Sequence, residues 1–485
     1  MEDVVAAASP EPNLRVVMVP SPGHGHLIPF VELSKRLLLR HNFSITIIVP
    51  DNGSGMIPQR QLLQTLPPTV SPLYLPPVSL SDVPSDANVI TRVTLTMIRS
   101  LPAIRDALIH LQHGNRGRVV AVVADFLGAD ALQVASQLQI PPYVFYTCSA
   151  FHLTLGLKAP ELHQTHPEEF RDSSEPLKLP GCVPFPGPDL PDPYLDKKKD
   201  AYKWMLHVHE RISNDAAGIM INSFMELESE IFKALTEERS RTGSGTAVYP
   251  IGPVPRLESD EDLAKLSNES IECLKWLDKQ PESSVLFISF GSGGKQSQVQ
   301  FDELAHGLAK SGKRFIWVVK PPGNNIVEVT DSIVPASFLP EGFLEKTKGV
   351  GLVIPGWAPQ IRILSHGSTG GFMSHCGWNS SLESITNGVP VLAWRNHAEQ
   401  RMNAVFLAEA AKVALRSDES SGKDGIVGRE EIARYVNAVL DGEEGKLLRR
   451  KVKELKAAAN TAIGNDGSST KSLDEVANLW KIQNP

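Results

Sequence analysis

Short runs of apolar and β-branched residues alternate with helical patterns along the chain, and they fall into two groups. In the first half these runs are RVVMV (15–19), ITIIVP (45–50), AVVADF (121–126) and YVFY (143–146). In the second half they are VLFISF (285–290), FIWVVK (315–320), GLVIP (351–355), GGFMSH (370–375) and VPVLAW (389–394). Strands that alternate with helices form parallel sheets. The pattern therefore predicts an α/β protein with two doubly wound parallel-sheet domains that face a central cleft.

A segment rich in glycine, proline and charge separates the two groups. It reads RTGSGTAVYPIGPVPRLESDEDLAKLSNES (241–270), which is typical of an interdomain linker. We expect one domain over residues 1–250 and a second over 251–465. A final helical segment, 466–485, is expected to pack back onto the first domain.

Composition and charge narrow the class of protein. The net charge is −7 and the pI is near 6.1, whereas a nucleic-acid-binding protein needs a basic face. No apolar run approaches the roughly 18 residues of a membrane span, and the N-terminus does not resemble a secretory signal. Four scattered cysteines (148, 182, 273 and 376) fit no zinc spacing and are typical of reduced thiols. We therefore expect a cytoplasmic protein without a metal site and without a nucleic-acid partner.

The loop after the first apolar run carries candidate chemistry. It reads PSPGHGHLIP (20–29), and apolar residues at helical spacing follow it, such as Leu27, Val31 and Leu37. His24 and His26 are therefore expected between a strand and a helix N-terminus, where open α/β sheets bind ligands. Taken alone, the loop favours the plainer interpretation that both histidines are ordinary polar residues.

The window from Trp357 to Gln400 reads WAPQIRILSHGSTGGFMSHCGWNSSLESITNGVPVLAWRNHAEQ. It resembles the signature box of plant family 1 UDP-glycosyltransferases, which act on small molecules, from WAPQ through HCGWNS to the closing EQ. The segments PSPGHGHLIP, LPGCVP (179–184), DAYKWMLH (200–207), FISFGSGG (287–294) and FLPEGF (338–343) agree. Together they are most similar to the subgroup that includes hydroquinone glucosyltransferase. The resemblance covers nearly the full length and implies the GT-B fold, with two Rossmann-like domains, the acceptor in the first and the UDP-sugar in the second.

The residues of this window suit a nucleotide sugar. Trp357 offers a flat face, and stacking of a base on such a face contributes about 1–3 kcal/mol. The segment from His375 to Ser380 ends a strand and opens a helix, whose N–H groups and dipole favour a diphosphate. The resemblance implies that Trp357 stacks on uracil and that Gln360 reaches the ribose. The donor-binding set expected in this way is Ser21, Thr147, Ser292, Trp357, Ala358, Gln360, His375, Trp378, Asn379, Ser380, Glu383, Glu399 and Gln400.

Glu383 has two interpretations. The pattern Ser380-x-x-Glu383 is also a capping box, in which the glutamate satisfies the N-terminus of its own helix. In the family the matching glutamate binds both ribose hydroxyls, and the surrounding motif favours that role here.

The end of the window departs from the family pattern. Glu399 and Gln400 match the pair that hydrogen-bonds the sugar, and a glutamine there is associated with glucose transfer. The family has proline, aliphatic and aromatic residues shortly before this pair, whereas this chain has Arg395-Asn396-His397. These polar residues either tip into solvent or alter the choice of donor sugar, for example toward one that carries a carboxylate.

Glycosyl transfer to a phenol requires the acceptor hydroxyl, whose pKa is near 10, to lose its proton as it attacks. Histidine is suited to this task, and the resemblance assigns it to His26, with inversion at the anomeric carbon. Asp125, at the end of AVVADF, matches the family's catalytic aspartate and would orient His26. It would also suit a helix cap, and the two roles can coexist. Thr147 and Ser21 lie at strand ends from which they would reach the donor.

The acceptor expected by resemblance is a small phenolic or related compound. Its pocket is expected to include His24, Phe126, Tyr146, Phe151 and His397, with Phe30 and Met205 as further candidates that are more often simply core residues.

Other classes of enzyme fit less well. The chain has no G-x-S-x-G motif of a serine hydrolase and no complete dinucleotide fingerprint of a dehydrogenase. A UDP-sugar epimerase of related fold and a UDP-sugar-binding protein without transfer stay open as alternatives. We expect a monomer that uses the UDP-sugar as co-substrate and needs no cofactor.

Overall fold

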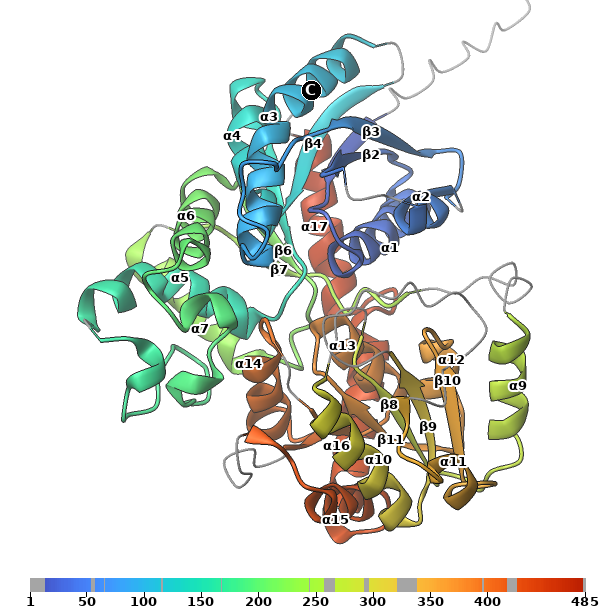
Figure 1. The fold of residues 1–485 in the computed structure, drawn as a ribbon. Coiled ribbons are helices and arrows are strands. Elements are labelled where there is room, and N and C mark those ends of the chain that lie inside the picture. Colours follow the sequence, from blue (N-terminus) through green and yellow to red (C-terminus); the bar gives the residue numbers. More distant parts are fainter. Residues whose placement is uncertain are drawn as a thin grey trace, which may run out of the picture.

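The structure is a computed structural model that describes residues 14–53, 57–64, 66–114, 117–166, 168–243, 245–256, 267–291, 296–320, 338–394, 397–416 and 425–482. Within these ranges the chain forms two parallel sheets, each flanked by helices (Figure 1). The first sheet is built from the N-terminal half of the chain and the second from the C-terminal half. The α/β architecture predicted from the alternating pattern is confirmed.

The first sheet has seven strands among the described residues, in the order β3-β2-β1-β4-β5-β6-β7, with parallel neighbours throughout. Its strands are β1 Leu14–Val19, β2 Ser44–Asp51, β3 Val70–Pro77, β4 Arg118–Asp125, β5 Pro142–Tyr146, β6 Gly218–Ile221 and β7 Val248–Pro250. Successive side chains of a strand point to opposite faces. On β1, Val16 and Met18 join one buried cluster and Val17 and Val19 join another, so both faces of this sheet are packed.

The second sheet has six strands in the described part of the chain, in the order β10-β9-β8-β11-β12-β13, again all parallel. Its strands are β8 Val285–Ser289, β9 Arg314–Val319, β10 Gly351–Pro355, β11 Thr369–Ser374, β12 Val391–Ala393 and β13 Ala414–Arg416. The same alternation appears on β8, where Leu286 and Ile288 face one cluster and Val285 and Phe287 face the other.

Helices connect the strands and cover the sheets. Around the first sheet they are α1 His24–His41, α2 Ile57–Gln64, α3 Val89–His113, α4 Asp130–Gln137, α5 Ala150–Thr165, α6 Asp200–Asp215 and α7 Ser229–Thr242. The later helices are α9 Asn268–Leu277, α10 Gln298–Ser311, α11 Phe343–Lys346, α12 Gln360–Ser365, α13 Trp378–Asn387, α14 Gln400–Val405, α15 Arg429–Leu440, α16 Glu443–Ala462 and α17 Ser468–Ile482. Short turns are η1 Phe126–Gly128, η2 Phe170–Asp172, η3 Gly187–Asp189, η4 Asp192–Tyr194 and the π-turn η6 Phe406–Ala410.

The last helix returns to the first sheet. α17, drawn in red in Figure 1, runs up beside this sheet and contacts β7 and β4. The buried ring of Trp480 lies edge-on to Tyr143, with 5.4 Å between ring centroids, and 5.8 Å from Phe43. Arg40 of α1 donates to both carboxylate oxygens of Asp474 on α17. The C-terminal helix is therefore held on the N-terminal sheet by an apolar contact and an ion pair.

Buried apolar residues also join the two halves near α14. One core cluster contains residues from helices that flank both sheets. In this cluster the ring centroids of Phe151, on α5, and Phe406 lie 6.2 Å apart. Close by, the indole Nε1 of Trp378 donates to the carbonyl of Asn222 at 2.7 Å. The two halves therefore meet through a packed contact at this end of the molecule.

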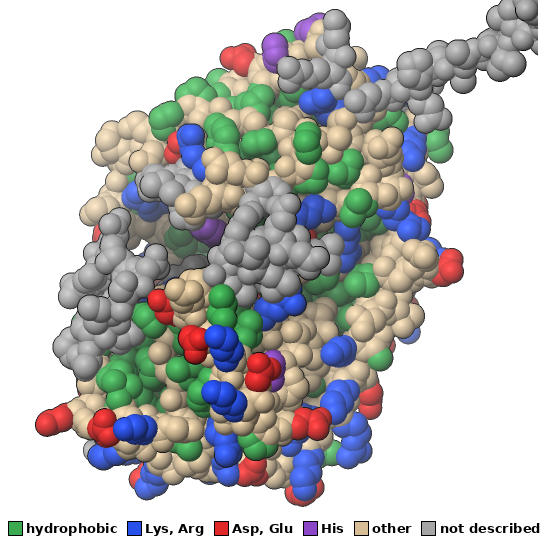
Figure 2. All heavy atoms as spheres, turned by 90° about the vertical axis from the view of Figure 1, so that its right-hand side faces the viewer, with side chains coloured by type: hydrophobic (Ala, Val, Ile, Leu, Met, Phe, Trp, Pro, Cys, Tyr) green, Lys and Arg blue, Asp and Glu red, His purple; other side chains and the backbone are tan. Residues whose placement is uncertain are grey.

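One face of the molecule, drawn in Figure 2, is mixed in charge over its lower half. On the face drawn in Figure 2, basic and acidic side chains are interspersed over the lower, C-terminal half. Among the described residues, none of the helices is sufficiently long and apolar to span a membrane. All four cysteines lie in the described part of the chain, where none of them forms a disulfide, and three of them are buried.

A buried carboxylate fixes the start of α5. Glu228, which precedes α7, accepts hydrogen bonds from the backbone N–H groups of Ala150 and Phe151, both at 2.9 Å. Burial raises the pKa of Glu228 to about 7, against hydrogen bonds that act to lower it. Because folding raises this pKa from 4.5, ionisation of Glu228 costs stability as the pH rises.

We expect Glu228→Gln to flatten the pH dependence of stability. The contribution of Glu228 in the unmodified protein is fully present below pH 4.5 and is lost as the pH rises through about 7. A shift of this size corresponds to about 3 kcal/mol. The melting temperature of both proteins would be compared between pH 5 and pH 8, with the exposed neighbour Glu226→Gln as the matched control. Equal slopes for all three proteins would contradict this assignment.

Candidate active site

The order of each sheet reverses once, and candidate residues gather at both reversal points. In open α/β sheets, ligands bind in the crevice at such a point, outside the carboxyl ends of the strands. In the first sheet the reversal lies between β1 and β4. His26 lies in the first turn of the helix that follows β1, and Asp125 is the last residue of β4. In the second sheet it lies between β8 and β11, which are followed by Gly291 and His375. The topology thus predicts two crevices, one at each reversal point.

His26 and Asp125 are in direct contact. The imidazole Nδ1 of His26 lies 3.0 Å from Oδ2 of Asp125, whose side chain is fully buried. The other oxygen, Oδ1, accepts the backbone N–H of Leu127 at 3.1 Å and caps η1. Asp125 therefore orients the histidine with one oxygen and caps the following turn with the other. Gly23 permits this arrangement, since its φ of +124° turns the chain from β1 directly into α1.

The electrostatics of His26 follow from this contact. Burial disfavours the imidazolium, but the charge and hydrogen bond of Asp125, together with the charge of Glu399, raise the pKa of His26 above 6.5. Because Asp125 accepts the proton on Nδ1, the neutral ring carries its lone pair on Nε2. The His26 side chain is 23% exposed, so solvent reaches it. The pair has the properties of a general base with an orienting acid.

Other predicted residues surround this pair. Thr147 is buried, and its hydroxyl donates to Oδ2 of Asp125 at 3.3 Å and lies 3.4 Å from Nδ1 of His26. Thr147 thus contacts the pair itself. The hydroxyl of Ser21 is buried and has no hydrogen-bond partner among the described residues. Phe126 packs against His26, with 5.7 Å between ring centroids. His24 is partly exposed, and burial lowers its pKa.

Tyr146, predicted as an acceptor-pocket residue, lies behind Phe126 in a buried hydrogen-bonded network that was not predicted from the sequence. The hydroxyl of Tyr146 lies 2.7 Å from Nδ1 of His152 and 2.9 Å from Nε2 of His209. His209 donates through Nδ1 to the carbonyl of Met205 at 2.8 Å, so its Nε2 accepts from Tyr146. Burial lowers the pKa of His152 to about 3 and that of His209 to about 4. Both rings are therefore neutral and hold Tyr146 in place.

At the second crevice, Gln360 and Glu383 are in direct contact, and Trp357 lies three positions before Gln360. Trp357 is 59% exposed, which is unusual for so large an apolar ring. The Nε2 of Gln360 donates to Oε2 of Glu383 at 2.6 Å and to the hydroxyl of Ser380 at 3.0 Å. Helix α13 begins at Trp378 with Gly377 at its N-cap, so Ser380 is its third residue. The capping-box interpretation of Glu383 is therefore excluded.

The N-terminus of α13 points to the same crevice. His375 precedes it, and burial, with the charges of His397 and Lys320 nearby, lowers the pKa of His375 to about 4. Gly291 leaves room for this ring, because a Cβ at that position would lie 2.6 Å from its Nε2. Lys320 donates to the carbonyl of Gly291 at 2.5 Å. A helix N-terminus beside a lysine suits an anion such as a diphosphate.

Asn379 connects the two crevices. This residue of α13 donates through Nδ2 to the carbonyl of Gly25 at 2.9 Å, and Gly25 directly precedes His26. The charge of Glu399, from the C-terminal half, also acts on His26. The candidate base and the candidate donor site are therefore adjacent across the interface.

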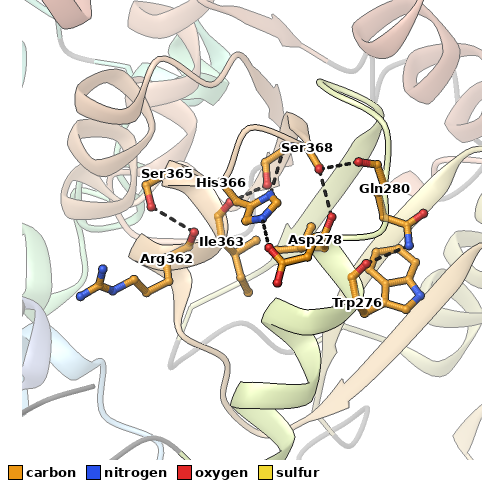
Figure 3. A network of polar contacts seen from close by, with 10 residues as sticks. Trp276, Asp278, Gln280, Arg362, Ile363, Ser365, His366 and Ser368 are labelled. Atoms are coloured by element: carbon orange, nitrogen blue, oxygen red, sulfur yellow. Dashed lines mark hydrogen bonds and ion pairs between the residues drawn. The ribbon is translucent and has the colours of Figure 1, made fainter. Parts of the chain in front are cut away.

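Helix α12, which begins with Gln360, is anchored from behind by a polar network (Figure 3). His366 accepts the backbone N–H of Ser368 on Nδ1 at 3.1 Å, so its Nε2 donates to Asp278 at 3.2 Å. The hydroxyl of Ser368 lies within hydrogen-bond distance of the carbonyls of Leu277 and Gln280. These contacts tie the end of α12 to the end of α9 and fix the helix that carries Gln360.

The residues at the end of the window make contacts of their own. The amide of Gln400 is bound twice by His397: its Oε1 accepts the backbone N–H at 3.1 Å, and its Nε2 donates to Nδ1 at 2.9 Å. Burial raises the pKa of Glu399, against a hydrogen bond from the backbone of Trp378 and the charges of His26 and His397. The Trp378 ring itself is buried in the interface between the halves.

Several predicted residues lie elsewhere. Ser292, Arg395 and Asn396 fall outside the described residues. Phe151 is fully buried between Phe185 and Phe406, so the structure places this acceptor candidate in the core. Phe30, Met205 and Ala358 are also buried. Within the described ranges, no group of three or more His, Cys, Asp or Glu side chains is arranged to hold a metal ion.

The chain is similar to proteins of known activity. Residues 245–440 match the family model described as UDP-glucoronosyl and UDP-glucosyl transferase. Over 471 residues the chain is 50% identical to hydroquinone glucosyltransferase of Rauvolfia serpentina, which covers 96% of this chain and 97% of that protein.

Solved structures show the same likeness. The chain is 46% identical to a UDP-glucosyltransferase from Polygonum tinctorium that is capable of glucosylating indoxyl and was solved with 3,4-dichloroaniline. The two structures superpose with a TM-score of 0.89, and the match covers 98% of this chain and 100% of the other. The chain is also 43% identical to Phytolacca americana UGT2, which was solved with UDP-2-fluoro-glucose and pterostilbene. The TM-score is 0.86, and the match covers 96% of this chain and 99% of the other.

Proposed function

Because the chain belongs to the plant family 1 UDP-glycosyltransferases, we propose that it transfers glucose from UDP-glucose to a hydroxyl of a small phenolic acceptor. The predicted GT-B fold is confirmed, and the protein is a UDP-dependent glycosyltransferase. The observation that carries the finer proposal is the His26–Asp125 pair, which lies at one crevice and next to the donor residues of the other.

In the proposed mechanism His26 is the general base. The acceptor oxygen attacks the anomeric carbon of the donor, and its proton passes to Nε2 of His26. The bond between the anomeric carbon and the β-phosphate oxygen breaks, and its electron pair leaves with UDP. Asp125 stabilises the imidazolium that forms, through the hydrogen bond at Nδ1. A single base without a nucleophilic carboxylate implies inversion, and hence a β-glucoside.

The donor is proposed to bind along the second crevice. Trp357 would stack on uracil, and Glu383 with Gln360 would exchange their mutual hydrogen bond for the ribose hydroxyls. The N-terminus of α13, with His375, would receive the diphosphate and stabilise its charge as the bond breaks. The proposed sugar contacts are Glu399 and Gln400.

We expect Trp357→Ala to weaken UDP binding without loss of stability. The ring is 59% exposed, so few packing contacts are lost in the free protein. The loss of stacking, about 1–3 kcal/mol, corresponds to a roughly 5- to 150-fold rise in the Kd of UDP. Titration calorimetry with UDP would measure it, and Leu447→Ala, at a residue 58% exposed on α16, is the matched control. Unchanged UDP affinity in the Trp357 variant would contradict the stacking role.

The acceptor class rests on the relatives, whose names and complexes include hydroquinone, pterostilbene and indoxyl. Phe126, packed on His26, provides an aromatic wall that suits a phenol ring, and the fully buried Tyr146 packs against it from the side of the core. The four cysteines, which form no disulfide among the described residues, support the proposal of a cytoplasmic location. We also propose that the enzyme acts as a monomer and without a metal.

Release of UDP from UDP-glucose, with and without a panel of simple phenols, tests this function. We expect release only when a phenol is present. Conversion of the donor without an acceptor would indicate an epimerase or a hydrolase. Binding of UDP-glucose without release for any acceptor would indicate a protein that has lost transfer. Release of UDP from a different UDP-sugar, but not from UDP-glucose, would refute the glucose assignment. It would favour the interpretation that Arg395-Asn396-His397 alter the choice of donor sugar.

A further inference from the structure

A proline-rich segment of the N-terminal half lies against the loop that carries the candidate sugar residues. This segment contains η3 and η4, and η3 contacts α14. In Figure 1, α14 is the orange helix that faces the green N-terminal segments. The segment contributes no residue to the two crevices described above. It contacts the residue that directly precedes Glu399 and Gln400 in the chain.

Asp192, the first residue of η4, binds this loop at three points. Its backbone N–H donates to the carbonyl of Ala398 at 3.1 Å, and its Oδ2 accepts the N–H of Ala398 at 2.7 Å. Its Oδ1 accepts Nη1 of Arg401 at 2.8 Å. Asp192 thus binds both the N–H and the carbonyl group of Ala398, and its side chain also binds the first turn of α14.

Ala398 needs such support. Its φ is +56°, a left-handed conformation that residues other than glycine rarely adopt. A backbone of this kind persists only where its surroundings hold it, and the two bonds from Asp192 do so. The conformation of Ala398 sets the direction of the next two residues. Glu399 occupies the N-cap position of α14, and Gln400 is the first residue of that helix.

A second pair on the same segment provides a comparison. Asp189 of η3 is buried and accepts Nη2 of Arg416, on β13, at 2.6 Å. This pair also joins the two halves of the chain, but Arg416 lies on a strand and not in the sugar loop. Asp189 and Asp192 therefore differ in what they position, although both bind an arginine of the other half.

We propose that Asp192 is a positioning residue for sugar recognition, which holds Glu399 and Gln400 in the geometry that selects the hexose. The inference rests on the proposed function, because it assigns these two side chains to the hydroxyls of the sugar. Asp192 touches neither the nucleotide group of Trp357, Gln360 and Glu383 nor His26. Its removal should therefore affect the sugar and not UDP.

The test compares Asp192→Ala and Arg401→Met with the unmodified enzyme, using UDP and three UDP-sugars. We expect kcat/KM for UDP-glucose to fall by up to about 10²-fold in Asp192→Ala, as for a misplacement of about 1 Å. The preference for UDP-glucose over UDP-galactose and UDP-xylose should fall toward unity, while the Kd of UDP stays within about twofold. Arg401→Met, which removes one of the three contacts, should show a smaller shift in the same direction.

Asp189→Asn is the matched control, expected to lower the melting temperature without changing the preference among sugars. An unchanged preference in both Asp192→Ala and Arg401→Met would overturn the inference, as would a loss of UDP affinity equal to the loss for UDP-glucose. If the unmodified protein transferred no sugar, the proposed function itself would fail and this inference with it. Should Asp192→Ala not fold, Arg401→Met and Asp192→Asn decide the question by the same measurements.

Discussion

Replacing His26 by alanine is expected to reduce kcat for glucose transfer by about 10²- to 10⁴-fold, the contribution of a positioned general base. The acceptor hydroxyl then has no group to take its proton, because Asp125 is fully buried beneath the histidine. Binding of UDP should change little, since the proposed nucleotide contacts come from the other half of the chain. Single-turnover rates and titration calorimetry with UDP measure the two effects separately.

His24→Ala is the matched control for this variant. His24 lies two positions earlier, on the same first turn of α1, and is not bonded to Asp125. We expect a smaller effect there, confined to the KM of the acceptor. A loss of UDP affinity in His26→Ala, or an equal loss of kcat in both variants, would count against the assigned role.

Asp125→Asn is expected to lower the rate through the tautomer of His26. Asparagine keeps one oxygen for the N–H of Leu127, so its amide group then faces Nδ1 of His26 and donates to it. The proton of the neutral ring moves to Nε2, where the base needs a lone pair. A hydrogen bond to a charged group is worth about 1.5–3 kcal/mol, or roughly 10- to 10²-fold in rate.

The pH profile distinguishes this effect from simple unfolding. In the unmodified enzyme Asp125 and Glu399 raise the pKa of His26 above 6.5, and we expect activity to fall as the pH drops through that pKa. Loss of the Asp125 charge leaves burial opposed only by the smaller effect of Glu399, so the pKa of His26 falls and the acid limb of kcat/KM should move to lower pH. An acid limb that stays in place while the rate falls would show that Asp125 does not set the pKa of the base.

Much of the fold was predictable because the central strands are continuous apolar runs. β1, β4, β8 and β11 are buried on both faces, and each matches a run in the sequence. The missed strands are short or lie toward the sheet edges. β3, VSPLYLPP, contains three prolines, which an edge strand tolerates because one side of its backbone has no partner strand. β13 has only three residues and lies at the edge of the second sheet.

Residues of the site were predictable where a sequence motif resembles that of a family whose site residues are known. His26 and Asp125 are 99 positions apart, and the resemblance to a family, not periodicity, paired them. The contact between Asp192 and Ala398 spans 206 positions and joins a proline-rich loop to a polar loop. Neither loop has a period, so no pattern in the sequence could indicate that they meet. The same holds for the pairing of Tyr146 with His209, which depends on how α6 packs against α5 and η1.

The most direct test of the account is the structure of the product formed from UDP-glucose and hydroquinone, determined by proton NMR. We expect a phenolic glucoside with β configuration at the anomeric carbon, formed together with one UDP for each glucoside. An α-glucoside would contradict direct displacement with His26 as base. Free glucose or UDP-galactose in place of a glucoside would contradict glycosyl transfer to the phenol itself.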